Sequence, residues 1–104
     1  MTLADLLAGA ASNLAGSSVE TAPDGTSIWT RSRRPFAMVS ADGGTAEFGL
    51  DPAVAAAAIR TPDVIPSVRG GGWVAFAPSE LDDHAADRAV AWFASAHRLA
   101  GPLD

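Results

Sequence analysis

The last third of the chain constrains the fold most strongly, because it carries the signals of a turn, a strand and a closing helix in direct succession. Three consecutive glycines at 70–72 permit a tight reversal of the backbone. The segment 73–77 then alternates its side chains as the pleat of a strand requires. Apolar residues recur at helical spacing over 81–100, in one stripe formed by Leu81, Ala85, Ala89, Trp92, Ala96 and Leu99. This region therefore predicts a strand covered by an amphipathic helix.

Helix and strand signals also organise the residues before this region. Thr2 with Asp5 forms a variant of the capping box, and Asp51 followed by Pro52 is typical of a helix start. In chain order we predict a helix at 3–14, strands at 18–22, 27–31, 36–40 and 45–50, a helix at 52–60, a loop or brief strand at 63–68, a strand at 73–77 and a helix at 81–100. This order, α-β-β-β-β-α-β-α, predicts an α+β fold whose helices pack on one face of an antiparallel sheet.

Length and composition limit the classes of protein to which the chain can belong. The 104 residues are enough for a single domain, 1–104. All seven basic residues are arginines against twelve acidic residues, and the net charge of -5 disfavours nonspecific binding to nucleic acid or anionic membranes. The absence of cysteine excludes disulfides and thiolate sites. No apolar run approaches the roughly 20 residues of a membrane span, and the N-terminal segment lacks the basic start of a secretory signal. We therefore expect a cytoplasmic protein that does not associate with membranes.

A set of short strings, taken in order, resembles the MmcQ/YjbR-like family from Val19 to Ala100. The strings are Pro35-Phe36-Ala37, Phe48-Gly49-Leu50-Asp51-Pro52, Thr61-Pro62-Asp63-Val64-Ile65-Pro66-Ser67, Gly71-Gly72-Trp73-Val74 and Ser95 in the final helix. The resemblance implies a frataxin-like CyaY fold and, from the DNA-binding label that the family often carries, a double-wing surface built from hairpins. The sequence departs from the family pattern in its acidic charge, in its lack of lysine, and in Ala96, which follows Ser95 where the family commonly has Ser-Tyr.

Four arginines are the candidate contacts for an anion or a nucleic acid. Arg31, Arg33 and Arg34 cluster at a predicted strand connection, and Arg69 precedes the glycines. Guanidinium groups pair bidentately with phosphate or carboxylate. The alternatives are a solvated connection whose charge protects the strand edges, and a contact with a partner protein. The glycine run lacks the spacing of phosphate-binding loops and precedes a strand, so we interpret it as a reversal and not as an amide nest for an anion.

Aromatic and histidine residues give weaker candidates. Trp29, Trp73 and Trp92 are typical of core positions, and the alternative is that they line a ligand cleft between the sheet and the final helix. His84 and His97 are thirteen residues apart on that predicted helix, about 20 Å along its axis, so they cannot bind one metal ion. We interpret His97 as a cation near the helix end. We expect neither a metal nor a cofactor.

These observations favour a small non-enzymatic binding domain whose ligand the sequence does not identify. No serine lies in a nucleophile elbow, and the neighbouring Asp82 and Asp83 are typical of a helix start, so we expect no enzyme. The alternative is a double-wing DNA-binding protein that contacts phosphates through its clustered arginines. A small-molecule sensor or enzyme that uses a cleft beside the final helix is a third hypothesis. Nucleic acid and protein both stay open as partners, and so does the oligomeric state.

Overall fold

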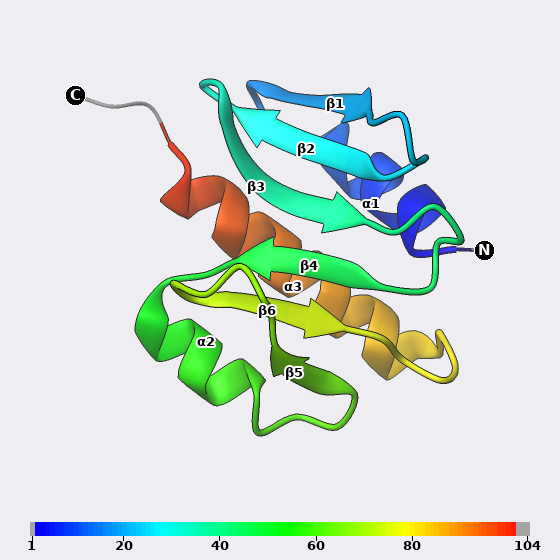
Figure 1. Ribbon diagram of the computed structural model, residues 1–104, viewed down its shortest axis with the longest axis vertical. Coiled ribbons are helices and arrows are strands. Elements are labelled where there is room, and N and C mark those ends of the chain that lie inside the picture. The colour runs from blue at the N-terminus through cyan, green and yellow to red at the C-terminus, as the bar shows by residue number, and fades with distance from the viewer. Residues whose placement is uncertain (1, 102–104) are drawn as a thin grey trace.

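The computed structural model describes residues 2–101, in which six strands form one antiparallel sheet (Figure 1). In chain order the elements are α1 (Leu3–Ala11), β1 (Ser17–Thr21), β2 (Ser27–Arg31), β3 (Arg34–Val39), β4 (Ala46–Gly49), α2 (Pro52–Ala58), β5 (Val64–Pro66), β6 (Trp73–Phe76) and α3 (Asp83–Leu99). The strands lie in the order β1-β2-β3-β4-β6-β5, and each neighbouring pair is antiparallel. The predicted α+β class is confirmed, and the segment left open as a loop or brief strand contributes the edge strand β5.

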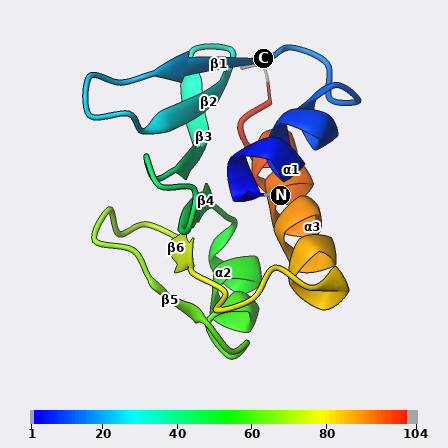
Figure 2. The same ribbon diagram turned by 90° about the vertical axis from the view of Figure 1, so that its right-hand side faces the viewer.

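The helices lie on one side of the sheet (Figure 2). α3 packs against β3 and β4, α1 packs against α3, and α2 contacts β6. The opposite face of the sheet carries no helix in the described part of the chain (Figure 2). Within residues 2–101, no helix combines the length and the hydropathy that a membrane span requires.

Four phenylalanines form the centre of the core between the sheet and the helices. Phe36, Phe48, Phe76 and Phe93 are fully buried. Phe93 of α3 contacts the ring of Phe36 at a centroid distance of 5.2 Å. Its neighbour Trp92 packs edge-on against Phe76, also at 5.2 Å. Aromatic pairs of this kind add about 0.5–1.5 kcal/mol each beyond the burial of their area. The prediction that the final helix seals one face of the sheet is therefore confirmed.

A β-bulge in β3 bends this strand away from its neighbour β4. Trp29 of β2 pairs with Ala37 and Thr30 pairs with Pro35, so Phe36 is the extra residue between them. Because of the bulge, Phe36 and Ala37 are both fully buried although they are consecutive. The pairing of β3 with β4 begins only at Ala37. The first residues of β3 are therefore free to diverge from the end of β4.

The helix starts follow the predicted chemistry, with one correction. Thr2 and Asp51 cap the first two helices as predicted. For α3 the sequence predicts a cap at Ser79 and a helix from 81, but the capping residue is Asp82, whose carboxylate accepts from the Ala85 amide at 2.9 Å. Asp82 directly precedes the first helical residue, which is the position from which a side chain reaches the free amides of the first turn. The helix therefore starts two residues later than the sequence predicts.

The connection between β2 and β3 is tighter than the sequence predicts. The polar segment 32–35 predicts a loop, but only Ser32 and Arg33 lie outside the strands, with φ of 53° and 68°. Two residues with positive φ match the twist of the flanking strands and close a two-residue hairpin. Neither residue is glycine or asparagine, so the sequence carried no signal for this turn. As a result, Arg31 and Arg34 pair directly across the hairpin.

Candidate functional site

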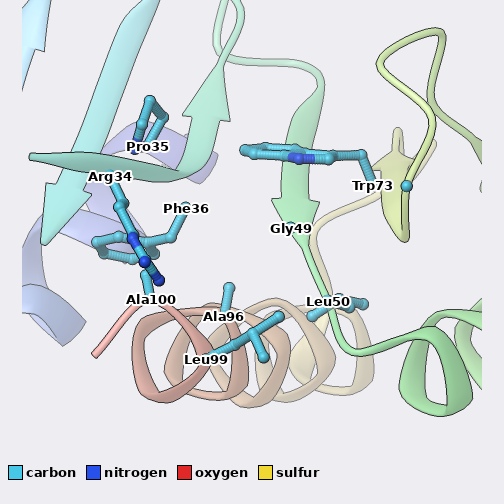
Figure 3. A pocket seen from close by; sticks show the side chains of 10 residues that line it. Arg34, Pro35, Phe36, Gly49, Leu50, Trp73, Ala96, Leu99 and Ala100 are labelled. Atoms are coloured by element: carbon cyan, nitrogen blue, oxygen red, sulfur yellow. The ribbon is translucent and has the colours of Figure 1, made fainter. Parts of the chain in front are cut away.

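A hollow opens beside the bulge of β3, where β3 and β4 separate (Figure 3). Its volume is about 170 Å³. Its walls come from β3, β4 and β6, and its floor is formed by the last turns of α3 (Figure 3). We call it the β3–β4 hollow, and the residues that define it are Arg34, Phe36, Gly49, Leu50, Trp73, Ala96 and Leu99.

Trp73 forms one wall of the hollow. Along β6, Val74 and Phe76 are buried on the helix side, so Trp73 projects from the opposite side. Its indole ring lies flat over Gly49 of β4 (Figure 3), where a Cβ atom would come within 2.9 Å of the ring. Glycine permits this close approach because it has no side chain. The glycine of β4 therefore determines where the indole lies.

Arg34 forms the wall across the hollow from Trp73 (Figure 3). It is the first residue of β3, and its side chain extends toward the C-terminal end of α3 (Figure 3). The residue is exposed, and within residues 2–101 its guanidinium makes no hydrogen bond or ion pair. The hollow thus combines one charged group with an aromatic face and an apolar floor.

Arg31 is held inside the molecule by α3. Its Nη1 donates to the backbone carbonyl of His97 at 2.9 Å and lies 3.2 Å from Nδ1 of the same residue. The imidazole is only 5% exposed, and its Nε2 lies 2.8 Å from the carbonyl oxygen of Ala15. A carbonyl only accepts and a guanidinium only donates, so Nε2 carries the proton and Nδ1 accepts from Arg31. The interpretation of His97 as a helix-end cation is therefore wrong, because its ring accepts a hydrogen bond from Arg31 and joins α3 to β2.

Arg69 is engaged on the helix-free face of the sheet. It forms an ion pair with Glu47 of β4, with Nη2 3.3 Å from Oε2, and its guanidinium carbon lies 5.8 Å from the centroid of the Trp73 ring. Ala46 and Phe48, the residues on either side of Glu47 in β4, are buried on the helix side, so the carboxylate of Glu47 faces away from the helices. The hydroxyl of Ser67 donates to the other carboxylate oxygen at 2.5 Å. This network anchors the β5–β6 turn to β4.

The four predicted arginines therefore occupy three different places. Arg31 and Arg34 pair at the start of β3, Arg33 lies at the exposed tip of the hairpin, and Arg69 lies on the helix-free face. Of the four, Arg34 alone borders the β3–β4 hollow. The arrangement is one of separate charges and not of a single convergent positive face.

The glycine run forms the tight reversal that the sequence predicts. Gly70, Gly71 and Gly72 have φ of 68°, 58° and 91°, in the left-handed region that glycine adopts readily. The Gly70 amide donates to the carbonyl of Ser67 at 3.1 Å, and the Trp73 amide donates to the carbonyl of Gly70 at 3.0 Å. Gly71 borders the β3–β4 hollow. Arg34 of the predicted arginine cluster and Gly71 of the glycine turn therefore meet at this hollow, whereas Arg69 does not border it.

The structure does not bring the three tryptophans together. Trp29 is buried in the core and lies edge-on to Phe93 at 5.4 Å. Trp92 is half-buried and packs on the phenylalanines of β4 and β6. Trp73 alone of the three borders the β3–β4 hollow. Two of the predicted cleft residues thus belong to the core, and one belongs to the hollow.

A second hollow, of about 290 Å³, lies between α2 and the glycine turn. Ala55 of α2, Ile59 directly after α2, Pro66 of β5 and Trp73 are among the residues that line it, and no lining side chain within residues 2–101 is charged. It therefore offers apolar surface without a charged group that would orient a ligand. The β3–β4 hollow is the stronger candidate although it is smaller.

Potential metal ligands do not gather in the part of the chain that the structure describes. No group of three or more histidine, aspartate or glutamate side chains is placed there to hold an ion. His84 is exposed near the start of α3, whereas His97 is buried near its end.

Comparisons with known proteins add no family to this description. No protein-family model matches the chain, and no curated protein gives a significant match. The resemblance to the MmcQ/YjbR-like family therefore stays a prediction that depends on the ordered strings, whereas the antiparallel α+β architecture is observed directly.

Sequence reasoning missed two features that shape the hollow. Gly49 was noted only within a string shared with a family, although a glycine inside a strand pattern is a signal for close approach of another group. The bulge at Phe36 left no such signal, because it depends on how this ring packs against α3. The sequence predicts Ala96 and Leu99 as part of an apolar helix face and not as site residues, and the structure places them in the floor of the hollow.

Proposed function

We propose that this protein is a small cytoplasmic YjbR-like binding domain that holds its ligand in the β3–β4 hollow without transforming it. The observation that carries this proposal is that Arg34, from the predicted arginine cluster, and Trp73, one of the three tryptophans considered for a cleft, line the same hollow from opposite sides (Figure 3). Ligand sites are commonly apolar concavities in which a few polar groups fix the orientation of the ligand. The β3–β4 hollow has this composition.

The chemistry of the lining supports binding over catalysis. Arg34 is the one ionisable side chain among the lining residues that the structure describes. A guanidinium stays protonated near neutral pH, so it binds anions but does not abstract protons as a general base does. The remaining lining side chains are apolar or aromatic, and Gly49 and Gly71 contribute backbone.

Nuclear magnetic resonance of the full chain tests this proposal with three single-ring probes: phenylacetate, benzyl alcohol and benzylamine. Trp73→Phe assigns the indole signal of Trp73, and Trp29→Phe assigns that of the core tryptophan. We expect at least one probe to shift the Trp73 indole signal and the Leu99 amide saturably at millimolar concentration, while the Trp29 indole signal stays in place. If no probe shifts the Trp73 signal, the hollow is not a binding site.

A double-wing DNA-binding function is the second candidate. The observation that favours it is the β2–β3 hairpin, where Arg33 and Arg34 are exposed and have no hydrogen-bond or ion-pair partner within residues 2–101. Contact with two phosphates would make the logarithm of the binding constant fall with the logarithm of salt concentration at a slope of about -2. Fluorescence anisotropy on a labelled duplex measures this slope, with Arg33→Ala/Arg34→Ala as the variant. A binding constant for the duplex that changes neither with salt concentration nor with the double substitution would exclude this function.

A further inference from the structure

We propose that the ligand of the β3–β4 hollow is a small monocarboxylate that carries a single ring or an apolar group of similar size. This inference rests on the proposed binding function and names the class of ligand. The size of the hollow, the character of its walls and the charge at its edge support this class of ligand.

The size of the hollow limits the ligand to about one ring. Its volume is about 170 Å³. A protein cavity of about 150 Å³ accepts benzene, whereas pockets for drug-sized ligands and cofactors measure about 300–1,000 Å³. A single ring with a short acidic arm therefore fits within the hollow, whereas most of a nucleotide or dinucleotide cofactor would lie outside it.

The walls favour an apolar, flat group. The indole of Trp73, held over Gly49, presents an aromatic surface, and Ala96 and Leu99 of α3 form the floor (Figure 3). Leu99 is 53% exposed, so part of its apolar surface is open to water. A ring seated against these groups would remove their apolar surface from water, and this removal is the main favourable term in such binding.

The charge at the edge of the hollow favours an anion. Arg31 and Arg34 lie directly opposite each other across the hairpin, and like charges in this arrangement repel. Arg31 is held by hydrogen bonds to His97, so it cannot turn away. Within residues 2–101 neither arginine has a carboxylate partner, since the ion pair found there joins Arg69 to Glu47. An anion bound to Arg34 would offset this repulsion.

A carboxylate matches the site better than a phosphate does. Arg34 is the one guanidinium that borders the hollow, and a guanidinium binds one carboxylate through two parallel hydrogen bonds. A phosphate monoester carries close to two negative charges at neutral pH. The single guanidinium of the hollow would balance one of these charges, and the other would be repelled by a protein whose net charge is already -5.

The experiment compares three ligands on the full chain: phenylacetate, its neutral analogue phenylacetamide, and phenyl phosphate. Binding is followed by the indole signal of Trp73 together with the amide signal of Leu99 in nuclear magnetic resonance, because Trp73 also borders the second hollow and Leu99 borders only the β3–β4 hollow. We expect phenylacetate to bind about tenfold more tightly than phenylacetamide, as a charge-assisted hydrogen bond provides. Arg34→Gln should abolish this preference, whereas Arg33→Gln, at the exposed neighbouring position, should keep it. Leu99→Glu is an independent variant, because it places a competing carboxylate beside the floor of the hollow. It should weaken the binding of phenylacetate at least tenfold.

The outcomes separate this inference from the proposed function. Equal affinity for phenylacetate and phenylacetamide, tighter binding of phenyl phosphate, or a preference that survives both Arg34→Gln and Leu99→Glu would each overturn the ligand class, while the hollow would remain a binding site. If none of the three compounds shifts the Trp73 signal, the ligand class fails; the proposed function fails with it only when benzyl alcohol and benzylamine also leave that signal in place. The one-dimensional spectrum of each variant establishes whether it is folded before the titration.

Discussion

The buried imidazole of His97 provides the sharpest test of how the helices are attached to the sheet. Its Nε2 donates to the carbonyl of Ala15 at 2.8 Å, and its Nδ1 accepts from Arg31 at 3.2 Å. It thus joins α3 to β2 and to the segment that precedes β1. His97→Phe keeps a ring of similar size in the core but removes both hydrogen bonds, so it isolates the contribution of the polar contacts.

The structure sets the expected cost of His97→Phe at about 2 kcal/mol of unfolding free energy. Ala15 is exposed, so its carbonyl can accept a hydrogen bond from water once the imidazole is gone. Loss of the bond from Nε2 therefore costs about 1 kcal/mol, at the low end of the range for a hydrogen-bonding group that loses its partner. Arg31 loses one of its two contacts to α3 but keeps the bond to the backbone carbonyl at 2.9 Å, which adds about 1 kcal/mol. For a domain of this size, this total corresponds to a decrease in Tm of about 8–16 °C.

Urea unfolding followed by tryptophan fluorescence measures this cost. His97→Gln, whose amide still donates to the Ala15 carbonyl, is expected to lose about half as much stability as His97→Phe. His84→Phe, at an exposed position on the same helix, should change stability by less than about 0.5 kcal/mol. A His97→Phe protein as stable as the wild type would refute the reasoning, and so would a His84→Phe protein that loses as much.

Three further predictions test the turns and caps. Gly72→Ala should lower the free energy of unfolding by about 3 kcal/mol or more, because its φ is 91° and a Cβ would collide with a backbone carbonyl. Gly70→Ala, at an open position with φ of 68°, should lower it by only about 1 kcal/mol. Thermal unfolding measures both. Asp82→Ala should lower stability by about 1 kcal/mol and Ser79→Ala should leave it unchanged in urea, since Asp82 caps α3. A serine hydroxyl and a glycine amide donate to Asp42 and lower its pKa. The carboxylate therefore stabilises the folded state above about pH 4, and this contribution is lost as the pH falls further. In a pH series of unfolding curves, the stability difference between wild type and Asp42→Asn should accordingly disappear below about pH 4.

The parts of the fold that sequence predicts correctly all depend on residues close together in the chain. The Thr2 cap acts on an amide three residues away, and the alternation over 73–77 needs only the pleat of one strand. The failures concern a turn whose residues carry no signal for it and a helix start at which a serine and an aspartate compete as caps. Ser32 and Arg33 adopt positive φ without a glycine signal, and the cap of α3 moved from the predicted serine to Asp82.

The candidate site shows the same division. The sequence singled out Arg34 as a candidate anion contact and Trp73 as a core residue or cleft candidate, but nothing in it indicated that they would border one hollow. Their meeting depends on the bulge at Phe36, which separates β3 from β4, and on Gly49, over which the indole lies. Sequence alone equally did not indicate that Arg31, in the same cluster as Arg34, is bound to α3 and does not reach the hollow.

The sequence by itself therefore determined the class of this fold, its helix and strand periodicities and the glycine reversal before β6. These properties follow from the preferences of each residue and its near neighbours for one backbone conformation. Only the tertiary structure decided which of the arginines stays available, because hydrogen bonds between segments that are 66 residues apart engage Arg31. Only the order of strands in the sheet and the bend in β3 place Arg34 across from Trp73, since both result from packing of the whole core.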